Sequence, residues 1–184
     1  MPASVLDESQ TVFAQAERLF TPAQIEAAIN HMADEINTHL SNTNPLVLGV
    51  MIGGMVPTGL LLPRFRFPLQ VDYLHVTRYH GETSGGQLRW IKHPDIPLKD
   101  RSVLVIDDVL DEGITLSAIT EACKAEGAHK VLTAVLVEKD LRRPAGLPRA
   151  DFVGLRAENR YLFGYGMDFK NYLRNADGIF AVRQ

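Results

Sequence analysis

The stretch VLVIDDVLDEGITL, residues 103–116, constrains the fold more than any other part of the chain. It begins with four consecutive apolar residues, a pattern typical of a strand that is buried on both faces of a sheet. Acidic residues follow, and a helical pattern is then expected from about Thr115 to Glu126, where Gly127 is placed to end the helix. A buried strand that leads almost directly into a helix predicts an α/β fold with a parallel sheet.

Other segments extend this prediction. Apolar runs at residues 46–52, 131–138, 151–157 and 179–182 indicate further strands, and alternation over 69–79 and the run 87–92 indicate two more. Residues 21–40 read as a helix that Thr21 and Gln24 cap, and residues 12–19 as a shorter helix. We therefore predict one domain over residues 1–184, whose ligands bind beyond the carboxyl ends of its parallel strands.

Composition excludes several classes of function. A formal net charge of −3 gives no reason to expect nucleic-acid binding. The uncharged stretch 45–63 is near the length of a membrane span, but Gly53, Gly54 and Pro57 interrupt it and favour a strand, a turn and a short helix. One cysteine, Cys123, rules out an internal disulfide and, with no pattern of a signal peptide, favours a cytoplasmic protein that does not bind membranes.

Four carboxylates within six positions, Asp107, Asp108, Asp111 and Glu112, raise an electrostatic question. They could form a solvated acidic turn. They could also include the magnesium-binding aspartate of a P-loop ATPase, but the nearest glycine spacing, GMVPTGLL, lacks the required lysine and hydroxyl. A third interpretation is a binding site in which the helix N-terminus binds a phosphate and the carboxylates bind sugar hydroxyls or magnesium. Such a site suits a phosphorylated ribose.

The stretch resembles the phosphoribosyl-pyrophosphate (PRPP) signature of type I phosphoribosyltransferases. Lys139 after the following strand, and the segment ENRYLFGYGMDFKNYLRN (158–175), resemble motifs of the hypoxanthine-guanine branch of that family. The resemblance runs from about residue 20 to the end of the chain. It implies a central, mostly parallel sheet flanked by helices. It also implies a small hood from the N-terminal part and C-terminal tail, and a flexible lid loop at residues 78–92.

The resemblance assigns roles in PRPP binding and catalysis. Asp107 and Asp108 contact the ribose hydroxyls, directly or near a magnesium ion, and Asp111 is the general base beside N7 of the purine. Asp168 holds a second magnesium ion. The 5′-phosphate is bound by the loop residues Glu112, Gly113, Ile114 and Thr115. The pyrophosphate is approached by Ile52, Gly53, Tyr79 and Arg174, the first two from a turn that commonly contains a non-proline cis peptide.

The purine has its own expected residues. Lys139 donates to the 6-oxo group, Tyr161 stacks on the base and the backbone of Leu162 meets its edge. The sequence also departs from the family pattern. Ile52 stands where lysine or arginine is common, and Glu112 replaces a common threonine, so we expect its amide to bind while its side chain points away. Arg78 precedes Tyr79 where the family has serine.

These residues together predict a purine-salvage enzyme. It would transfer the 5-phosphoribosyl group from PRPP to N9 of hypoxanthine or guanine, with magnesium, giving IMP or GMP and pyrophosphate. One alternative is a regulator on the same fold that senses PRPP or nucleotide, for which the basic cluster 141–149 would be the contact surface. Another is a xanthine-preferring enzyme. The resemblance also implies a homo-oligomer, either a dimer or a tetramer.

Overall fold

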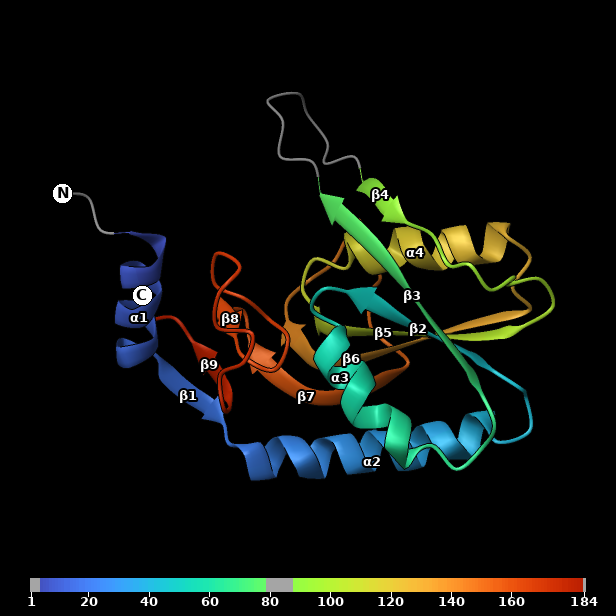
Figure 1. The fold of residues 1–184 in the computed structure, drawn as a ribbon, viewed down its shortest axis with the longest axis horizontal. Helices are drawn as coiled ribbons and strands as arrows, with labels where there is room; N and C mark the ends of the chain where they lie inside the picture. The colour runs from blue at the N-terminus through green and yellow to red at the C-terminus, as the bar shows by residue number, and fades with distance from the viewer. Residues whose placement is uncertain (1–3, 79–87, 184) are drawn as a thin grey trace.

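The computed structural model describes residues 4–78 and 88–183, and its centre is a six-stranded sheet (Figure 1). The strand order is β4-β3-β2-β5-β6-β7, and the β3–β4 pair is antiparallel while the other neighbours are parallel. The strands are β2 (Leu46–Met51), β3 (Gln70–Arg78), β4 (Leu88–Lys92), β5 (Ser102–Leu110), β6 (Lys130–Asp140) and β7 (Phe152–Glu158). The predicted α/β fold with a mostly parallel sheet is confirmed.

Helices cover the sheet on both sides (Figure 1). On one side lie α2 (Pro22–Leu40) and α3 (Met55–Leu61), which a short 3-10 turn (Leu62–Arg64) follows; on the other lies α4 (Ile114–Ala125). Successive strand residues pack into opposite layers, so that Leu104 joins the α2 layer and Val105 the α4 layer. The apolar runs therefore do not alternate with polar residues, because both faces of each central strand are buried.

Local signals at helix ends are confirmed. The Thr21 side chain accepts a hydrogen bond from the Gln24 amide, and the Gln24 side chain accepts one from the Thr21 amide at 2.9 Å, which completes the capping box of α2. Gly127 follows α4 with a φ of +87°, a conformation that favours glycine. The helix after the acidic stretch therefore ends where the sequence predicts.

Both ends of the chain meet in a second, three-stranded sheet with the order β1-β9-β8. Its strands are β1 (Glu17–Phe20), β8 (Leu162–Phe163) and β9 (Ile179–Ala181), and α1 (Val5–Gln15) precedes them. The helix predicted over residues 12–19 was therefore wrong in its extent, because the backbone of 17–20 pairs with β9 instead of continuing α1. The family resemblance implies a hood formed by these N-terminal and C-terminal parts of the chain.

Strands β5 and β6 extend beyond the apolar runs from which they were predicted. Leu110 at the end of β5 still pairs with Glu138, so Asp107 and Asp108 lie within the strand and not in the turn after it. Likewise β6 extends to Asp140, so Lys139 is part of the strand that it was expected to follow. Pairing with a parallel neighbour carries each strand past the point where hydrophobicity alone would end it.

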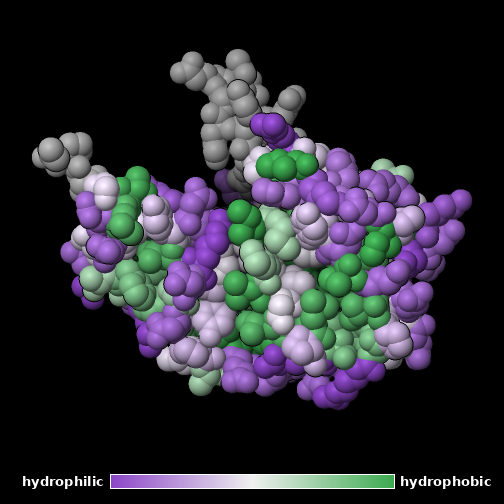
Figure 2. Space-filling view, in the orientation of Figure 1, coloured by the Kyte–Doolittle hydropathy of each residue, from purple (hydrophilic) through white to green (hydrophobic). Residues whose placement is uncertain are grey.

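The uncharged stretch 45–63 contains β2, a turn and α3, as predicted. Within the residues that the structure describes, no helix is long and apolar enough to span a bilayer. Figure 2 shows apolar residues gathered over α3 and β3 on the face in view. Large hydrophobic residues of these elements that are exposed include Met55, Val71 and Tyr73. No helix of the described chain covers this outer part of β3.

Candidate active site

Two cavities meet at the carboxyl end of β5. One, of about 230 Å³, is lined by the acidic stretch and the start of α4, including Asp107, Gly113 and Thr115. The other, of about 300 Å³, is lined by residues predicted to hold a base or a metal: Lys139, Tyr161, Leu162 and Asp168. Both include Asp108, Val109 and Asp111. The fold thus brings the predicted phosphate and base residues to adjoining spaces.

Asp107 and Asp108 form a crowded acidic pair within β5. The Asp108 amide donates to the Asp107 carboxylate at 2.9 Å. Burial raises the pKa of Asp108 to about 6. Burial, with repulsion from Asp108, raises the pKa of Asp107 well above its ordinary value. Negative charge at this point therefore costs free energy unless a cation approaches it.

Gly53 brings the turn after β2 against this acidic pair. A Cβ atom at Gly53 would lie 1.9 Å from the Asp108 Oδ2 atom. Gly166 in turn packs on Gly53, since its own Cβ would lie 2.2 Å from the Gly53 carbonyl oxygen. The Met51–Ile52 peptide is cis, as the family resemblance implies for this turn. Three segments of the chain thus converge with no room for larger residues.

Asp111 and Lys139 form a direct ion pair, with 2.7 Å between the Lys139 Nζ and Asp111 Oδ2 atoms. The Lys139 side chain is only 10% exposed, whereas that of Asp111 is 45% exposed. The lysine side chain is therefore nearly buried, while the more exposed carboxylate lines both cavities. The predicted general base and the predicted base-recognising lysine are in contact.

The predicted phosphate loop is the start of α4. Gly113 has a φ of +75° and precedes the first helical residue, Ile114. Amide groups in the first turn of a helix have no acceptor within the helix and point along the positive end of its dipole. Glu112 is exposed, and Thr115 is half-buried beside the cavity. This arrangement suits an anion.

The loop after β8 carries two further predicted residues. Asp168 and Arg174 form an ion pair of 2.7 Å, and Arg174 also donates to the Gly166 carbonyl at 2.5 Å. The Asn171 amide donates to Asp168 at 2.8 Å. Since Gly166 packs on Gly53, this loop places Asp168 and Arg174 beside the turn after β2.

Tyr161 and Leu162 differ in exposure. Tyr161 is 53% exposed at the mouth of the base cavity, and its ring meets the edge of Phe169 with 5.7 Å between centroids. Leu162 is 5% exposed. Ile52 is 44% exposed and lines neither cavity. Tyr79 and most of the predicted lid lie outside the described residues.

The three carboxylates predicted to hold metal offer the oxygen ligands that Mg²⁺ prefers. Among residues 4–78 and 88–183, however, no three His, Cys, Asp or Glu side chains lie together as a complete metal site. Carboxylate oxygens of this kind are compatible with Mg²⁺, which usually keeps several waters and binds one or two carboxylates together with substrate phosphates.

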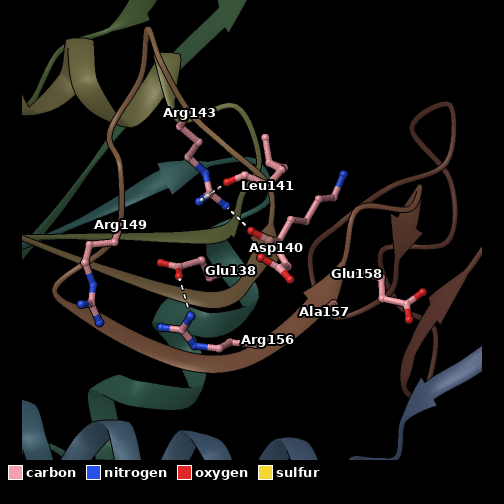
Figure 3. A pocket seen from close by; sticks show the side chains of 9 residues that line it. Glu138, Asp140, Leu141, Arg143, Arg149, Arg156, Ala157 and Glu158 are labelled. Atoms are coloured by element: carbon pink, nitrogen blue, oxygen red, sulfur yellow. Dashed lines mark hydrogen bonds and ion pairs between the residues drawn. The ribbon is translucent and has the colours of Figure 1, made fainter.

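Sequence reasoning missed Arg143. It belongs to the cluster 141–149, which reads as a solvated basic loop, but its guanidinium donates to five backbone carbonyls: those of Leu110, Asp111, Lys139, Leu141 and Pro148. Figure 3 shows this side chain turned toward the end of β6, beside a larger cavity of about 550 Å³. Backbone acceptors carry no side-chain signature, so the basic composition of the loop was the only signal.

Comparison with known proteins agrees with this geometry. The model of the phosphoribosyl transferase domain matches residues 15–170. The chain belongs to the phosphoribosyltransferase family. It is 29% identical to the hypoxanthine-guanine phosphoribosyltransferase of Bacillus subtilis, over 90% of this chain and 92% of the relative. It is 30% identical to the hypoxanthine-guanine-xanthine phosphoribosyltransferase of Tritrichomonas foetus, over 90% and 91%.

Solved structures resemble this phosphoribosyltransferase as well. A crystal structure of a hypoxanthine phosphoribosyltransferase from Staphylococcus aureus superimposes with a TM-score of 0.85, covering 100% of this chain and 97% of the other, at 24% identity. At that identity the likeness shows the fold. A structure titled hypoxanthine-guanine-xanthine phosphoribosyltransferase gives a TM-score of 0.79 at 26% identity, covering 91% of this chain and 94% of the other.

Proposed function

We propose that this phosphoribosyltransferase acts in purine salvage. It transfers the 5-phosphoribosyl group of PRPP to N9 of hypoxanthine or guanine and yields IMP or GMP with pyrophosphate. The observation that carries the proposal is the Asp111–Lys139 ion pair at the junction of the two cavities. Asp111 lines both cavities, and Lys139 lines the predicted base cavity.

In the proposed reaction, the bond between C1′ and the pyrophosphate oxygen breaks and a bond from N9 to C1′ forms. The purine loses a proton, and Asp111 accepts it at the N7 side. Lys139 donates to the 6-oxo group, which adenine lacks, and Tyr161 stacks on the ring. A purine that bonds to Lys139 would meet an ammonium that is already paired with Asp111, the proposed general base. The groups for purine recognition and for proton transfer would therefore lie side by side.

The sugar and phosphates occupy the other cavity in this proposal. Asp107 and Asp108 accept hydrogen bonds from the ribose hydroxyls, and the amides of 112–115 with the Thr115 hydroxyl bind the 5′-phosphate. Ile52, Gly53, Tyr79 and Arg174 approach the pyrophosphate. Bound Mg²⁺ would neutralise charge on the departing pyrophosphate, with one ion near Asp107 and Asp108 and a second held by Asp168.

The alternative function, a regulator that senses PRPP or nucleotide, has less support. Its contact surface was the basic cluster 141–149, but Arg143 of that cluster is turned inward onto backbone carbonyls. The xanthine-preferring alternative differs only in contacts at the purine 2-position, and a relative whose name includes xanthine lies at 30% identity. An assay with several bases separates these readings.

The experiment incubates the purified chain with PRPP, Mg²⁺ and one base at a time, namely hypoxanthine, guanine, xanthine or adenine. Nucleotide formation is followed by chromatography. We expect IMP and GMP and little or no AMP. Lack of product from all four bases would exclude the enzyme, and XMP as the main product would favour the xanthine reading.

We also propose that the enzyme is a cytoplasmic homo-oligomer, a dimer or a tetramer. The apolar surface over α3 and β3 supports self-association, since large exposed apolar patches often mark protein interfaces (Figure 2). Light scattering coupled to size-exclusion chromatography tests this. A mass of a single chain at assay concentration would contradict it.

A further inference from the structure

Arg143 ties together the two strands that carry the proposed chemistry. Its Nε atom donates to the Asp111 carbonyl at 2.5 Å and its Nη2 atom to the Leu110 carbonyl at 2.9 Å. The same Nη2 atom also donates to the carbonyl of Lys139. One guanidinium therefore bonds to the backbone of both members of the Asp111–Lys139 pair. It also donates a hydrogen bond within its own loop, to the Pro148 carbonyl at 3.3 Å.

These bonds set the direction of the amides in the phosphate loop. In a trans peptide the carbonyl and the next amide N–H point in opposite directions. Arg143 holds the Asp111 carbonyl on the side of the loop 141–149, so the Glu112 N–H points to the other side. The Leu147 amide does the same for the Gly113 carbonyl, at 3.0 Å, and thereby sets the direction of the Ile114 N–H.

The backbone of the loop 141–149 lies in close contact with the phosphate loop. A Cβ atom at Gly146 would be 2.1 Å from the Glu112 carbonyl oxygen. A Cβ atom at Gly113 would be 2.5 Å from the Leu147 carbonyl oxygen. Both contacts are to backbone atoms, which cannot move aside as a flexible side chain can. Loop 141–149 thus forms the rear support of the phosphate loop.

We propose that Arg143 is a positioning residue for PRPP binding. It fixes the Leu110 and Asp111 carbonyls behind the phosphate loop so that the Glu112 amide points toward the 5′-phosphate, and its positive charge polarises that amide. The inference rests on the proposed function, and it adds a residue to which neither the sequence motifs nor the family resemblance assigns a role. Arg143 itself touches no substrate in this arrangement.

The variant Arg143→Lys tests geometry apart from charge. Lysine keeps the positive charge, but a single ammonium cannot reproduce the fork that reaches the carbonyls of Leu110, Asp111 and Lys139 together. Arg142→Lys is the matched control, because Arg142 is the preceding residue of the same loop and is exposed. Both variants are measured for the KM of PRPP, the KM of guanine and kcat, and for the Kd of PRPP by titration calorimetry.

For Arg143→Lys we expect the KM and Kd of PRPP to rise about tenfold or more. A loop amide that turns away loses its hydrogen bond to the charged 5′-phosphate, and such a loss costs at least about that factor. The KM of guanine should change less than about threefold, and Arg142→Lys should match the wild type within about twofold. Mere loss of stability would instead reduce the active fraction, lowering kcat and leaving both KM values unchanged. Such a result, or equal effects of the two variants, would overturn the proposal.

A second pair of variants guards against misfolding of Arg143→Lys. Gly146→Ala should push the Glu112 peptide away and raise the KM of PRPP in the same selective manner. Gly59→Ala is its control, since a Cβ atom at Gly59 meets open space. An unchanged KM in Gly146→Ala would count against the support role of loop 141–149. If the wild type and both controls fail to bind PRPP, the proposed function itself is wrong.

Discussion

The two halves of the acidic stretch solve the same electrostatic problem in different ways. In the strand half, Asp107 and Asp108 are adjacent and their pKa values are raised, chiefly by burial. In the turn half, Asp111 has the Lys139 ammonium at 2.7 Å, and Arg143 binds the backbone beside it. The turn half thus has a lysine in direct contact, whereas in the strand half the charge of Arg174 offsets only part of the effect of burial on the two pKa values.

This difference indicates a division of labour within a short stretch of sequence. The turn half is already organised for a base and a phosphate, because its charges are balanced by residues of β6 and the loop after it. Arg174 offsets part of the charge of the strand half, and the proposed substrate complex would add Mg²⁺ together with its phosphates.

Removal of Mg²⁺ should have the largest effect, because it acts on the half whose ionised carboxylates are disfavoured by burial. After dialysis against EDTA, turnover should fall below detection and return when Mg²⁺ is added. The released pyrophosphate gives the readout. Full activity in the presence of excess EDTA would show that Asp107 and Asp108 function without a metal. It would contradict the proposed difference between the two halves.

Asp111→Asn should have the next largest effect. The amide cannot accept the purine proton, so kcat should fall about 10²- to 10⁴-fold, while the Kd of PRPP should change less than about threefold. Asp140→Asn, at the exposed end of β6, is the matched control. Steady-state kinetics and calorimetry provide the two values. Loss of PRPP binding with an unchanged kcat would contradict the role in proton transfer that is proposed for Asp111.

Lys139→Gln tests the cation of the turn half. It removes the proposed donor to the 6-oxo group and leaves Asp111 without its ion pair. The preference for hypoxanthine over adenine, as a ratio of kcat/KM values, should fall about tenfold or more. Lys130→Gln at the opposite, exposed end of β6 serves as control. An unchanged preference would remove Lys139 from base recognition.

Glu112→Gln should have the smallest effect. The proposal assigns the phosphate contact to its backbone amide, which the substitution retains. The KM of PRPP should therefore stay within about threefold of the wild type. A change of more than about tenfold would mean that the carboxylate takes part, and that the turn half carries charge chemistry beyond Asp111.

The sequence predicts the parts of the fold that rest on local chemistry. The capping box of Thr21 and Gln24 and the stop at Gly127 are confirmed, because both depend on residues within one turn of the helix end. Leu19 was placed in a helix and lies in β1, because its segment pairs with β9 from the far end of the chain. Pairing of that kind leaves no local pattern.

The candidate site shows the same limit. Residues with a motif, such as Asp108, Lys139 and Asp168, lie together around one cavity, as the resemblance led us to expect. Arg143 escaped notice because its partners are carbonyl groups, which every residue has. Their position depends on how β5 and β6 end, and both strands run further than their apolar residues indicate.

One competition assay tests the central claim most directly. The chain is given PRPP and Mg²⁺ with equal amounts of hypoxanthine, guanine, xanthine and adenine, and mass spectrometry identifies the nucleotides formed before any base is exhausted. IMP, GMP or both should dominate, with AMP near background, because the proposed role of Lys139 is to select a 6-oxo group beside Asp111. A mixture dominated by AMP, or one without any nucleotide, would contradict the account.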